Sequence, residues 1–340
     1  MSVPFIHFDP QPADYWRGIV LFGRNVASYK FALAQSLLDL RPSDGQLVRL
    51  EELARPFSRH LCAHLREADK QGTSRQSRFL EACRRANAGE ITTEELVEQT
   101  VRLGFNNVID AFHVVGQDEI PHRFFLDERK NGGIRVTEHF SKLLEGPQVG
   151  NLPAETDARW RLVETAWELG VNPGLLAAVD HDAEAEVLFV VDAARRRRPI
   201  TGIRGALNGY QKGCCFYCYA DMAITTTEPP DVDHFFPHSL RAAGMGPIVD
   251  GVWNLVLACR ACNRGANGKF NRIPTLRLLE RLSTRNEFLI DSHHPLRETL
   301  MAQTGNSPVE RRGYLAAFHQ QARAALIHEW EPVEVRELRF

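Results

Sequence analysis

Four of the seven cysteines stand in two closely spaced pairs. Cys215 and Cys218 form one Cys-x-x-Cys pair, and Cys259 and Cys262 form another, with 40 residues between the pairs. A Cys-x-x-Cys turn places two thiolates on one side of a tight loop, and two such turns complete a tetrahedral sulfur cage suited to Zn²⁺. One pair alone can be a redox motif or a coincidence. Two pairs that bracket a short segment predict a structural zinc site.

A second set of polar residues is interleaved with the cysteines. Asp233 and His234 are adjacent, Asn254 follows before the second pair, and Asn263 comes directly after it. This order resembles the HNH nuclease family, the ββα-metal group of endonucleases. It is also similar to the HNH domain of RNA-guided CRISPR effectors, which shares the Asp-Val-Asp-His run and an Asn-Arg-Gly near its end. The resemblance covers about residues 200–285, roughly a quarter of the chain.

The resemblance implies a role for each of these residues. His234 would be the general base that takes a proton from the attacking water, which suits an imidazole with an unperturbed pKa of about 6.5. Asp233 and Asn263 would bind a divalent cation through oxygen atoms. Asn254 would orient the loop that carries His234. The cation would stabilise the charge of the transition state and the leaving 3′ oxygen.

Two details qualify this interpretation. Successive residues of a strand point to opposite faces, so Asp233 and His234 need a bend or a turn to reach one site. Asn263 stands where the commonest form of the family has histidine. Asparagine is a weaker and neutral ligand, so it favours Mg²⁺ or Mn²⁺ over Zn²⁺ as the catalytic ion.

Two other functions remain open. A zinc-ribbon adaptor that binds nucleic acid without cutting it would explain the four cysteines, but it leaves the ordered aspartate, histidine and asparagines as coincidence. A nuclease whose N-terminal domain binds a protein partner or a small signal, as in bacterial restriction and anti-phage systems, would use the same site under different control. The leading prediction is a metal-dependent endonuclease acting on nucleic acid, with DNA favoured as substrate.

Charge is distributed unevenly along the chain, although the net charge is only −2. Residues 195–340 hold 20 Lys and Arg against 14 Asp and Glu, a net +6, whereas residues 1–194 hold 21 against 29, a net −8. A basic C-terminal part suits a polyanion. The acidic N-terminal part suits a protein partner or a regulator.

Several basic residues are candidates for contacts with nucleic-acid phosphates. Lys269, Arg264 and Arg260 flank Asn263 on or beside the expected metal-bearing helix. A run of four arginines precedes the module: Arg195, Arg196, Arg197 and Arg198. Two interpretations of this run are open: contacts with phosphates, or a solvated linker or helix start. Its position next to the expected nuclease module favours phosphate contacts.

Composition restricts the class of protein. With 44% hydrophobic and 25% charged residues, the chain resembles an ordinary folded protein, and no apolar run approaches the ~20 residues of a membrane span. The first residues lack a basic segment followed by an apolar one, so we expect no signal peptide. Four presumed zinc ligands among the seven cysteines indicate a reducing compartment, and we expect the cytoplasm.

The expected fold is mainly α (α+β), in three parts. Residues 1–194 form a mostly helical domain, 195–290 a small zinc-stapled ββα-metal module, and 291–340 a C-terminal helical extension that packs on the rest. Apolar periodicity and cap signals predict these elements. The expected helices span 14–40 with a break near 23–25, 46–68 kinked or split at Pro56, 74–88, 93–103, 136–144, 157–169, 201–211, 275–285 and 308–328. The expected strand spans 187–191, and 119–136 is a hairpin or ordered loop.

Two histidine pairs are further candidates for ligands. His60 and His64 stand four apart on one face of the expected helix 46–68, but no acidic or third ligand accompanies them, so a packed or solvated helix face is favoured. His293 and His294 are more simply polar residues at a turn.

Overall fold

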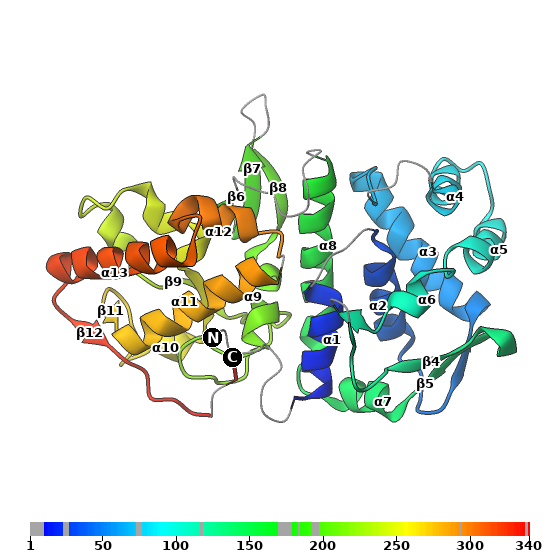
Figure 1. Ribbon diagram of the computed structural model, residues 1–340, viewed down its shortest axis with the longest axis horizontal. Coiled ribbons are helices and arrows are strands. Elements are labelled where there is room, and N and C mark those ends of the chain that lie inside the picture. Colours follow the sequence, from blue (N-terminus) through cyan, green and yellow to red (C-terminus); the bar gives the residue numbers. More distant parts are fainter. Residues whose placement is uncertain are drawn as a thin grey trace. The chain divides into compact units, whose positions relative to one another are not determined.

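The chain forms two compact units that divide between Asn172 and Pro173 (Figure 1). The structure is a computed structural model, and it describes residues 10–22, 27–72, 77–115, 118–168, 179–182, 184–191, 197–292, 294–336 and 339–340. The division lies before the predicted boundary at 195, because the strands between residues 179 and 202 pack with the C-terminal unit. Residues 291–340 also belong to that unit.

The N-terminal unit is mainly helical, with two small antiparallel sheets in its described part. Its helices are α1 (Pro12–Leu21), α2 (Tyr29–Leu40), α3 (Leu50–Glu67), α4 (Arg78–Asn87), α5 (Thr93–Leu103), α6 (Val108–Ala111), α7 (Glu138–Glu145) and α8 (Leu152–Glu168). One sheet has the order β1 (Leu47–Arg49), β5 (Gly133–Val136) and β4 (Phe125–Glu128), and the other pairs β2 (Val114–Val115) with β3 (Asp118–Glu119).

Local chemistry explains the clearest of these elements. Helix α5 begins where Thr92 Oγ1 accepts a hydrogen bond from the Glu95 N–H while the Glu95 carboxylate accepts one from the Thr92 N–H. Helix α3 continues through Pro56 as a single helix instead of splitting. Its apolar face, which includes Leu53, Phe57 and Leu61, is fully buried and holds the helix against the core.

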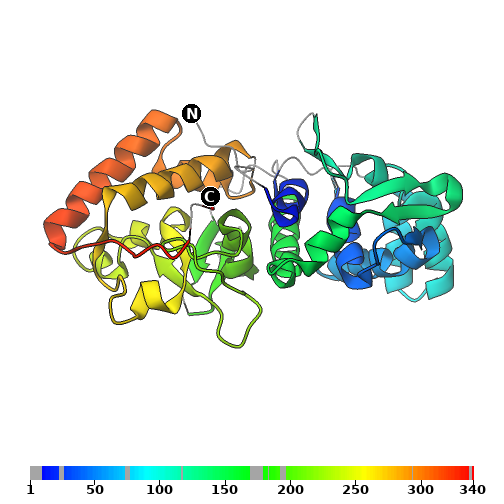
Figure 2. The ribbon, with the colours of Figure 1, turned by 90° about the horizontal axis from the view of Figure 1, so that it is seen from below.

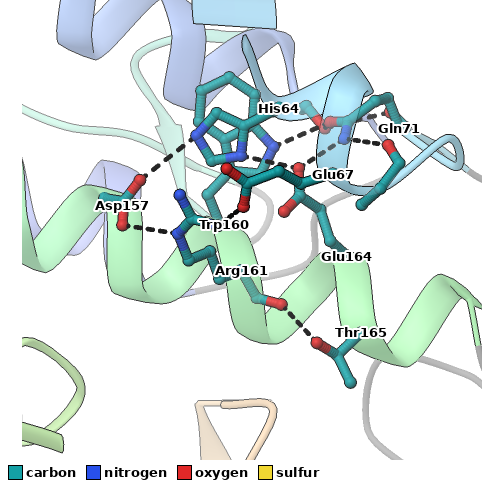
Figure 3. Close-up of polar contacts among 10 residues, drawn as sticks. His64, Glu67, Gln71, Asp157, Trp160, Arg161, Glu164 and Thr165 are labelled. Atoms are coloured by element: carbon teal, nitrogen blue, oxygen red, sulfur yellow. Dashed lines mark hydrogen bonds and ion pairs between the residues drawn. The ribbon is translucent and has the colours of Figure 1, made fainter. Parts of the chain in front are cut away.

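A buried polar network joins α3 to α8 in the core of the N-terminal unit (Figure 3). The His64 ring stacks on Trp160 with centroids 3.6 Å apart. Its Nδ1 lies 2.8 Å from Glu164 and its Nε2 lies 3.3 Å from Asp157. Burial lowers the pKa of His64, but the two carboxylates outweigh burial and raise it. His64 is therefore a packed structural residue, and His60, which contacts Asp39, does not pair with it.

The C-terminal unit combines helices with three small sheets in the part that the structure describes. Its strands are β6 (Val179–Asp182), β7 (Val187–Val191), β8 (Arg197–Gly202), β9 (Asp231–His234), β10 (Leu255–Ala258), β11 (Ile273–Pro274) and β12 (Glu329–Trp330). Its helices are α9 (Ile203–Gln211), α10 (Arg260–Arg264), α11 (Leu276–Asp291), α12 (Arg297–Thr304) and α13 (Pro308–Ala325). The sheets are β6-β7-β8 and β9-β10, both antiparallel, and the parallel pair β11-β12.

Helices α11, α12 and α13 pack against one another (Figure 1). Trp253, which precedes β10, is fully buried and contacts Phe318 of α13 at a centroid distance of 5.0 Å. Phe236, which follows β9, also contacts the Phe318 ring, at a centroid distance of 4.8 Å. The aromatic contacts thus fix the loop between β9 and β10 against the C-terminal helices.

The chain after β12 returns across this unit to the first cysteine pair (Figure 2). Val335 N donates to Cys218 O at 3.0 Å, and Glu334 pairs with Arg281 of α11. The Arg281 guanidinium also donates to the carbonyls of Phe216 and Tyr217, so one buried side chain ties α11 to the cysteine turn. In the described part of the chain, no helix has the length and apolar character needed to cross a membrane.

Candidate functional site

The two cysteine pairs meet in space. The sulfur atoms of Cys215, Cys218, Cys259 and Cys262 all lie within 4.8 Å of one another, the one such group of potential metal ligands among the described residues. Cys218 Sγ and Cys259 Sγ are 3.8 Å apart. Four thiolates around Zn²⁺, each at about 2.3 Å, give sulfur separations of about 3.8 Å, whereas a disulfide needs about 2.05 Å. The four cysteines can therefore hold a metal such as zinc.

Backbone hydrogen bonds place the two cysteine turns side by side. Helix α9 ends at Lys212, which adopts a left-handed conformation with φ 53°, and the chain then turns into the first pair. Phe216 N donates to Leu257 O at 3.0 Å, which ties this turn to β10. Cys259 occupies the N-cap of α10, and its N–H lies 3.3 Å from Cys215 Sγ as a donor. An N–H that points at sulfur stabilises a thiolate, the form that binds metal.

Strands β9 and β10 form an antiparallel pair, and the short helix α10 follows β10 in the chain. Asp233 pairs with Val256 and His234 with Leu255 in an antiparallel ladder. All four residues of β10 are buried, and α10 begins two residues after this strand ends. Asp231 and Asp233 share one face of β9, while His234 belongs to the other, because side chains alternate along a strand. Asp233 and His234 therefore lie in two different environments, one on each face of β9.

Asp233 is buried between a phenol and an ammonium group. Tyr217 Oη donates to Asp233 Oδ2 at 2.6 Å, and Lys269 Nζ lies 3.2 Å from Asp233 Oδ1. Burial raises the pKa of Asp233, and the Lys269 charge and the Tyr217 hydrogen bond oppose this. Burial likewise lowers the pKa of Lys269, and Asp233 opposes it. Each charge is therefore held in the interior mainly by the other.

Asn263 lies against Asp231. Its Nδ2 donates to Asp231 Oδ2 at 3.0 Å, and the guanidinium of Arg264 contacts Asp231 Oδ1 at 2.8 Å. No hydrogen bond to Asn263 Oδ1 is found within the described ranges. Asn263 therefore contacts Asp231, whereas Asp233 contacts Tyr217 and Lys269, and no hydrogen bond joins the two predicted ligands among the described residues.

The oxygen atoms on this face of β9 suit a hard divalent cation. Two carboxylates, Asp231 and Asp233, and the amide oxygen of Asn263 are the donor types that Mg²⁺ and Mn²⁺ prefer. Against this, Lys269 already supplies a positive charge at Asp233, and Arg264 supplies one at Asp231. A cation bound there would compete with both side chains.

The other face of β9 gathers three imidazoles around one carboxylate. His234 Nε2 lies 3.2 Å from Asp250 Oδ1, and His238 Nε2 lies 3.3 Å from the same oxygen. Arg241 holds the second oxygen of Asp250 at 2.5 Å. His181 of β6 completes the group, with its ring centroid 6.5 Å from that of His234.

Several imidazole nitrogens in this group are buried without a hydrogen bond. Both ring nitrogens of His181 and Nε2 of His234 have no hydrogen-bond partner among the described residues. The approach of Asp250 to His234 Nε2 is close but lies outside hydrogen-bond geometry. Burial lowers the pKa of His234 to about 4, with Asp250 opposing and His238 adding to the shift. His234 is therefore a neutral imidazole at pH 7, the form that can accept a proton.

Asn254 fixes the loop that follows His234. Its side chain is fully buried, accepts a hydrogen bond from Phe236 N at 2.8 Å, and donates to the carbonyls of Phe236 and Val249. Its backbone carbonyl accepts from Phe235 N at 2.7 Å. Three of these four bonds connect the segment before β10 to Phe235 and Phe236, directly after His234, which is the arrangement that an orienting role needs.

The predicted phosphate contacts have different surroundings. Lys269 is 1% exposed, and its ammonium group contacts Asp233 and the carbonyl of His234. It therefore does not lie at the surface where a phosphate would bind. Arg264 and Arg260 are exposed, and they pair with Asp231 and Glu228. In the arginine run, Arg195 and Arg196 lie outside the described residues. Of Arg197 and Arg198, only the backbone is described, in β8.

Sequence reasoning missed four residues of this site. Asp231 has a simple signal, since it stands two residues before Asp233 and shares its face of the strand. Tyr217 lies inside the first cysteine pair, where the zinc pattern drew attention only to the cysteines. Asp250 and His181 have no local signal, because they reach His234 only through the tertiary fold.

The C-terminal unit thus brings together a four-cysteine group, the carboxylates of Asp231 and Asp233 with the amide of Asn263, and, on the opposite face of β9, the half-buried imidazole of His234. The comparison with known proteins adds no relative to this description: no protein-family model, no curated protein and no solved structure matches the chain.

Proposed function

We propose that this protein is a metal-dependent endonuclease of the HNH type that hydrolyses phosphodiester bonds in nucleic acid, with DNA as the favoured substrate. The observation that carries the proposal is His234. It is a half-buried imidazole, with Nε2 enclosed and a pKa lowered to about 4, at the end of a strand whose opposite face holds Asp231 and Asp233. Metal-assisted hydrolysis needs a neutral base and oxygen ligands for the metal ion, and this strand carries both, on its two faces.

In this proposal His234 accepts the proton of the attacking water. The water oxygen forms a bond to phosphorus as the bond between phosphorus and the 3′ oxygen breaks, and the leaving oxygen takes a proton from solvent. The products are a 5′-phosphate and a 3′-hydroxyl. Nε2 of His234 is buried next to Asp250, so Nδ1 is the nitrogen that we assign to proton transfer. Asn254 holds the loop after His234 in place.

Asp233, Asp231 and Asn263 would hold the divalent cation, which we expect to be Mg²⁺ or Mn²⁺ from the chemistry of these donors. When bound, this ion supplies charge neutralisation at the phosphate and at the leaving oxygen. Arg264 and Arg260, both exposed, are the described side chains that we assign to phosphate contacts. Zn²⁺ in the four-cysteine group would serve the structure and take no part in hydrolysis.

The N-terminal unit would have a different task. Its acidic composition favours a protein partner or a regulator over nucleic acid, and we propose that the protein serves as the effector of a bacterial restriction or anti-phage system.

The rival function is a zinc-ribbon adaptor that binds nucleic acid without cutting it. One observation favours it: Lys269 and Arg264 neutralise the two carboxylates of β9 from within the protein, so this face of the strand is electrically balanced in the absence of a metal ion.

The test incubates the purified protein with plasmid, linear duplex, single-stranded DNA and RNA in Mg²⁺, Mn²⁺ or EDTA. We expect cutting in at least one arm with metal and none in EDTA. His234→Ala should lower the rate by roughly 10²–10⁴ and leave nucleic-acid binding and zinc content near normal. The matched control is His122→Ala, which removes an exposed imidazole of the N-terminal unit.

Two results would overturn the assignment in different ways. Binding without cutting by the unmodified protein, under every metal condition, favours the adaptor. Cutting that persists unchanged in His234→Ala removes this residue as the base. Asp233→Ala and Asn263→Ala should also lose activity, but added Mn²⁺ should restore part of it in these two variants only.

A further inference from the structure

Phe270 is exposed to solvent beside the proposed metal ligands. Its side chain is 52% exposed, and it is the only exposed phenylalanine among those that the structure describes. The other described phenylalanines are buried or half-buried, as is usual for this side chain. A single exposed aromatic ring is common on protein surfaces. Its backbone and its surroundings set this ring apart.

The backbone of Phe270 adopts the left-handed conformation, with φ 45°. Bulky L side chains rarely adopt this conformation, because Cβ approaches the following carbonyl oxygen. Such strain persists only where surrounding contacts impose it, and it is concentrated at functional sites. Glycine would adopt this conformation without strain. The chain nevertheless has a phenylalanine at this position.

The loop around Phe270 is tightly built. Phe270 N donates to the carbonyl of Asn263 at 3.0 Å, and Lys269 Nζ lies 3.3 Å from the Phe270 carbonyl. Trp330 Nε1 donates to Asn267 O at 2.7 Å, which fixes the loop to β12. A Cβ added to Gly268 would lie 2.8 Å from Gly265 N, so the loop has no room to relax there. The ring is therefore presented to solvent by a fixed backbone.

Three arginines lie close to this loop along the chain, and Arg264 and Arg260 also pair with Asp231 and Glu228. Arg264 lies on α10 with its side chain 54% exposed, and Arg260 lies one turn earlier on the same helix with 61% exposure. Arg272 follows Phe270 by two residues and donates to the carbonyls of Asn267 and Gly268. Surfaces that bind single-stranded nucleic acid combine exposed aromatic rings, on which bases stack, with cations that contact phosphates, and this segment carries both residue types.

We propose that Phe270 stacks on a nucleobase next to the scissile phosphate, one that is unpaired or displaced from its neighbours. The inference rests on the proposed nuclease function and adds to it the recognition of an exposed base face. Phe270 is joined to Asn263 by one backbone hydrogen bond, so a base held by this ring positions the adjoining phosphate near the proposed metal ligands. Stacking is tolerant of sequence, since every base has an aromatic face.

The experiment measures the binding of labelled single-stranded and duplex DNA and RNA oligonucleotides in EDTA, over a series of salt concentrations. Phe270→Ala should weaken binding to the preferred strand roughly 5- to 150-fold, the loss expected for one stacked base. The slope of log Kd against log salt should stay unchanged, because no phosphate contact is lost. Phe270→Trp should retain binding. The matched control Arg264→Gln should flatten the salt slope by about one ion.

Phe270→Gly separates stacking from folding. Glycine adopts a φ of 45° without strain, so this variant should melt at or above the temperature of the unmodified protein and bind as weakly as Phe270→Ala. Unchanged binding by both variants, while the unmodified protein binds, overturns this inference and leaves the nuclease proposal standing. Failure of the unmodified protein to bind any of the oligonucleotides overturns both.

Discussion

Lys269 Nζ lies 3.2 Å from Asp233 Oδ1, and both side chains are buried, with exposures of 1% and 8%. The ammonium also donates to the carbonyl of His234 at 2.9 Å. One cation therefore touches both residues of the Asp-His pair that the sequence singles out. Any divalent cation that binds Asp233 has to share this carboxylate with Lys269 or displace it. The ion pair thus controls how the proposed metal site is filled.

Replacing Lys269 by methionine should destabilise the C-terminal unit. Breaking a buried ion pair on one side typically costs about 3–5 kcal/mol, because the remaining charge is left without a partner. If Asp233 is a metal ligand, Mn²⁺ should then raise the melting temperature of Lys269→Met by more than that of the unmodified protein. Thermal melts with and without Mn²⁺ measure both effects.

The control for this experiment is the double variant Asp233→Asn/Lys269→Met. It removes both charges, so it should recover part of the lost stability and lose the response to Mn²⁺. The salt dependence of nucleic-acid binding should not change in Lys269→Met, since this buried ammonium is not available to a phosphate. A flattened salt slope would return Lys269 to the phosphate contacts that the sequence predicted.

Features with a local cause were predictable from the sequence. The helix expected over 93–103 is α5, because Thr92 and Glu95 form a capping box within one turn. The strand expected over 187–191 is β7. The grouping of the four cysteines also follows from their spacing. The mainly helical character with small sheets is confirmed for the described residues.

The rest depends on contacts between distant parts of the chain. Lys269 follows Asp233 by 36 positions and Asp250 follows His234 by 16, and no spacing rule connects residues that meet only when loops close. The sheet β6-β7-β8 is another such case, since it joins residues on both sides of position 195, where the sequence places a boundary, into the C-terminal unit. Strand alternation places Asp233 and His234 on opposite faces of β9, and the continuous ladder with β10 contains no bend that would turn both to one site, although the nuclease interpretation of the sequence requires one.

Zinc should be required for the C-terminal unit to fold. Cys259→Ser removes one of four thiolates, and a structural zinc can contribute on the order of 10 kcal/mol to a small domain. We expect about one Zn²⁺ per chain in the unmodified protein by elemental analysis, and its loss together with cooperative melting of this unit in Cys259→Ser. Cys62→Ser, which changes a buried cysteine of the N-terminal unit, is the control and should keep its zinc. A zinc-free Cys259→Ser protein that melts normally would contradict a structural role.

His113 should make the N-terminal unit less stable in acid. It is 2% exposed, and its Nε2 accepts a hydrogen bond from Phe124 N at 3.0 Å, which only the neutral ring can do. Burial, with smaller effects of Arg123 and Lys30, lowers its pKa from 6.5 to about 3. The pKa of His113 is lower in the folded than in the unfolded protein. Its full contribution to the free energy of unfolding is therefore present above pH 6.5, and it is lost as pH falls towards 3. The loss is at most about 1.4 kcal/mol per pH unit.

Hydrogen exchange of the N-terminal unit between pH 7 and 5, corrected for intrinsic rates, measures this effect. His113→Gln is the comparison, since its amide oxygen can accept the Phe124 hydrogen bond without titrating. We expect a shallower pH dependence in this variant. Equal slopes in the two proteins would show that His113 does not govern acid stability.

Asp250 should position His234 for catalysis. Its Oδ1 lies 3.2 Å from His234 Nε2, and a carboxylate there favours the tautomer that carries its proton on Nε2 and leaves the Nδ1 lone pair free. Asp250→Asn keeps the shape but removes the charge. We expect its kcat to fall about 10- to 100-fold, in the range typical for loss of an orienting partner, with KM, zinc content and melting temperature nearly unchanged.

Two measurements distinguish this role from a structural one. Nitrogen chemical shifts in histidine-labelled protein, with His234 assigned by comparison with His234→Gln, should show the Nε2–H tautomer in the unmodified protein and a mixture in Asp250→Asn. This readout does not depend on activity. Asp291→Asn, which changes an exposed carboxylate at the end of α11, is the kinetic control and should cut at the normal rate. An unaltered tautomer together with an unaltered kcat in Asp250→Asn would mean that the close approach of Asp250 to His234 has no part in the reaction, and that the half-buried imidazole is held by the Asn254 loop alone.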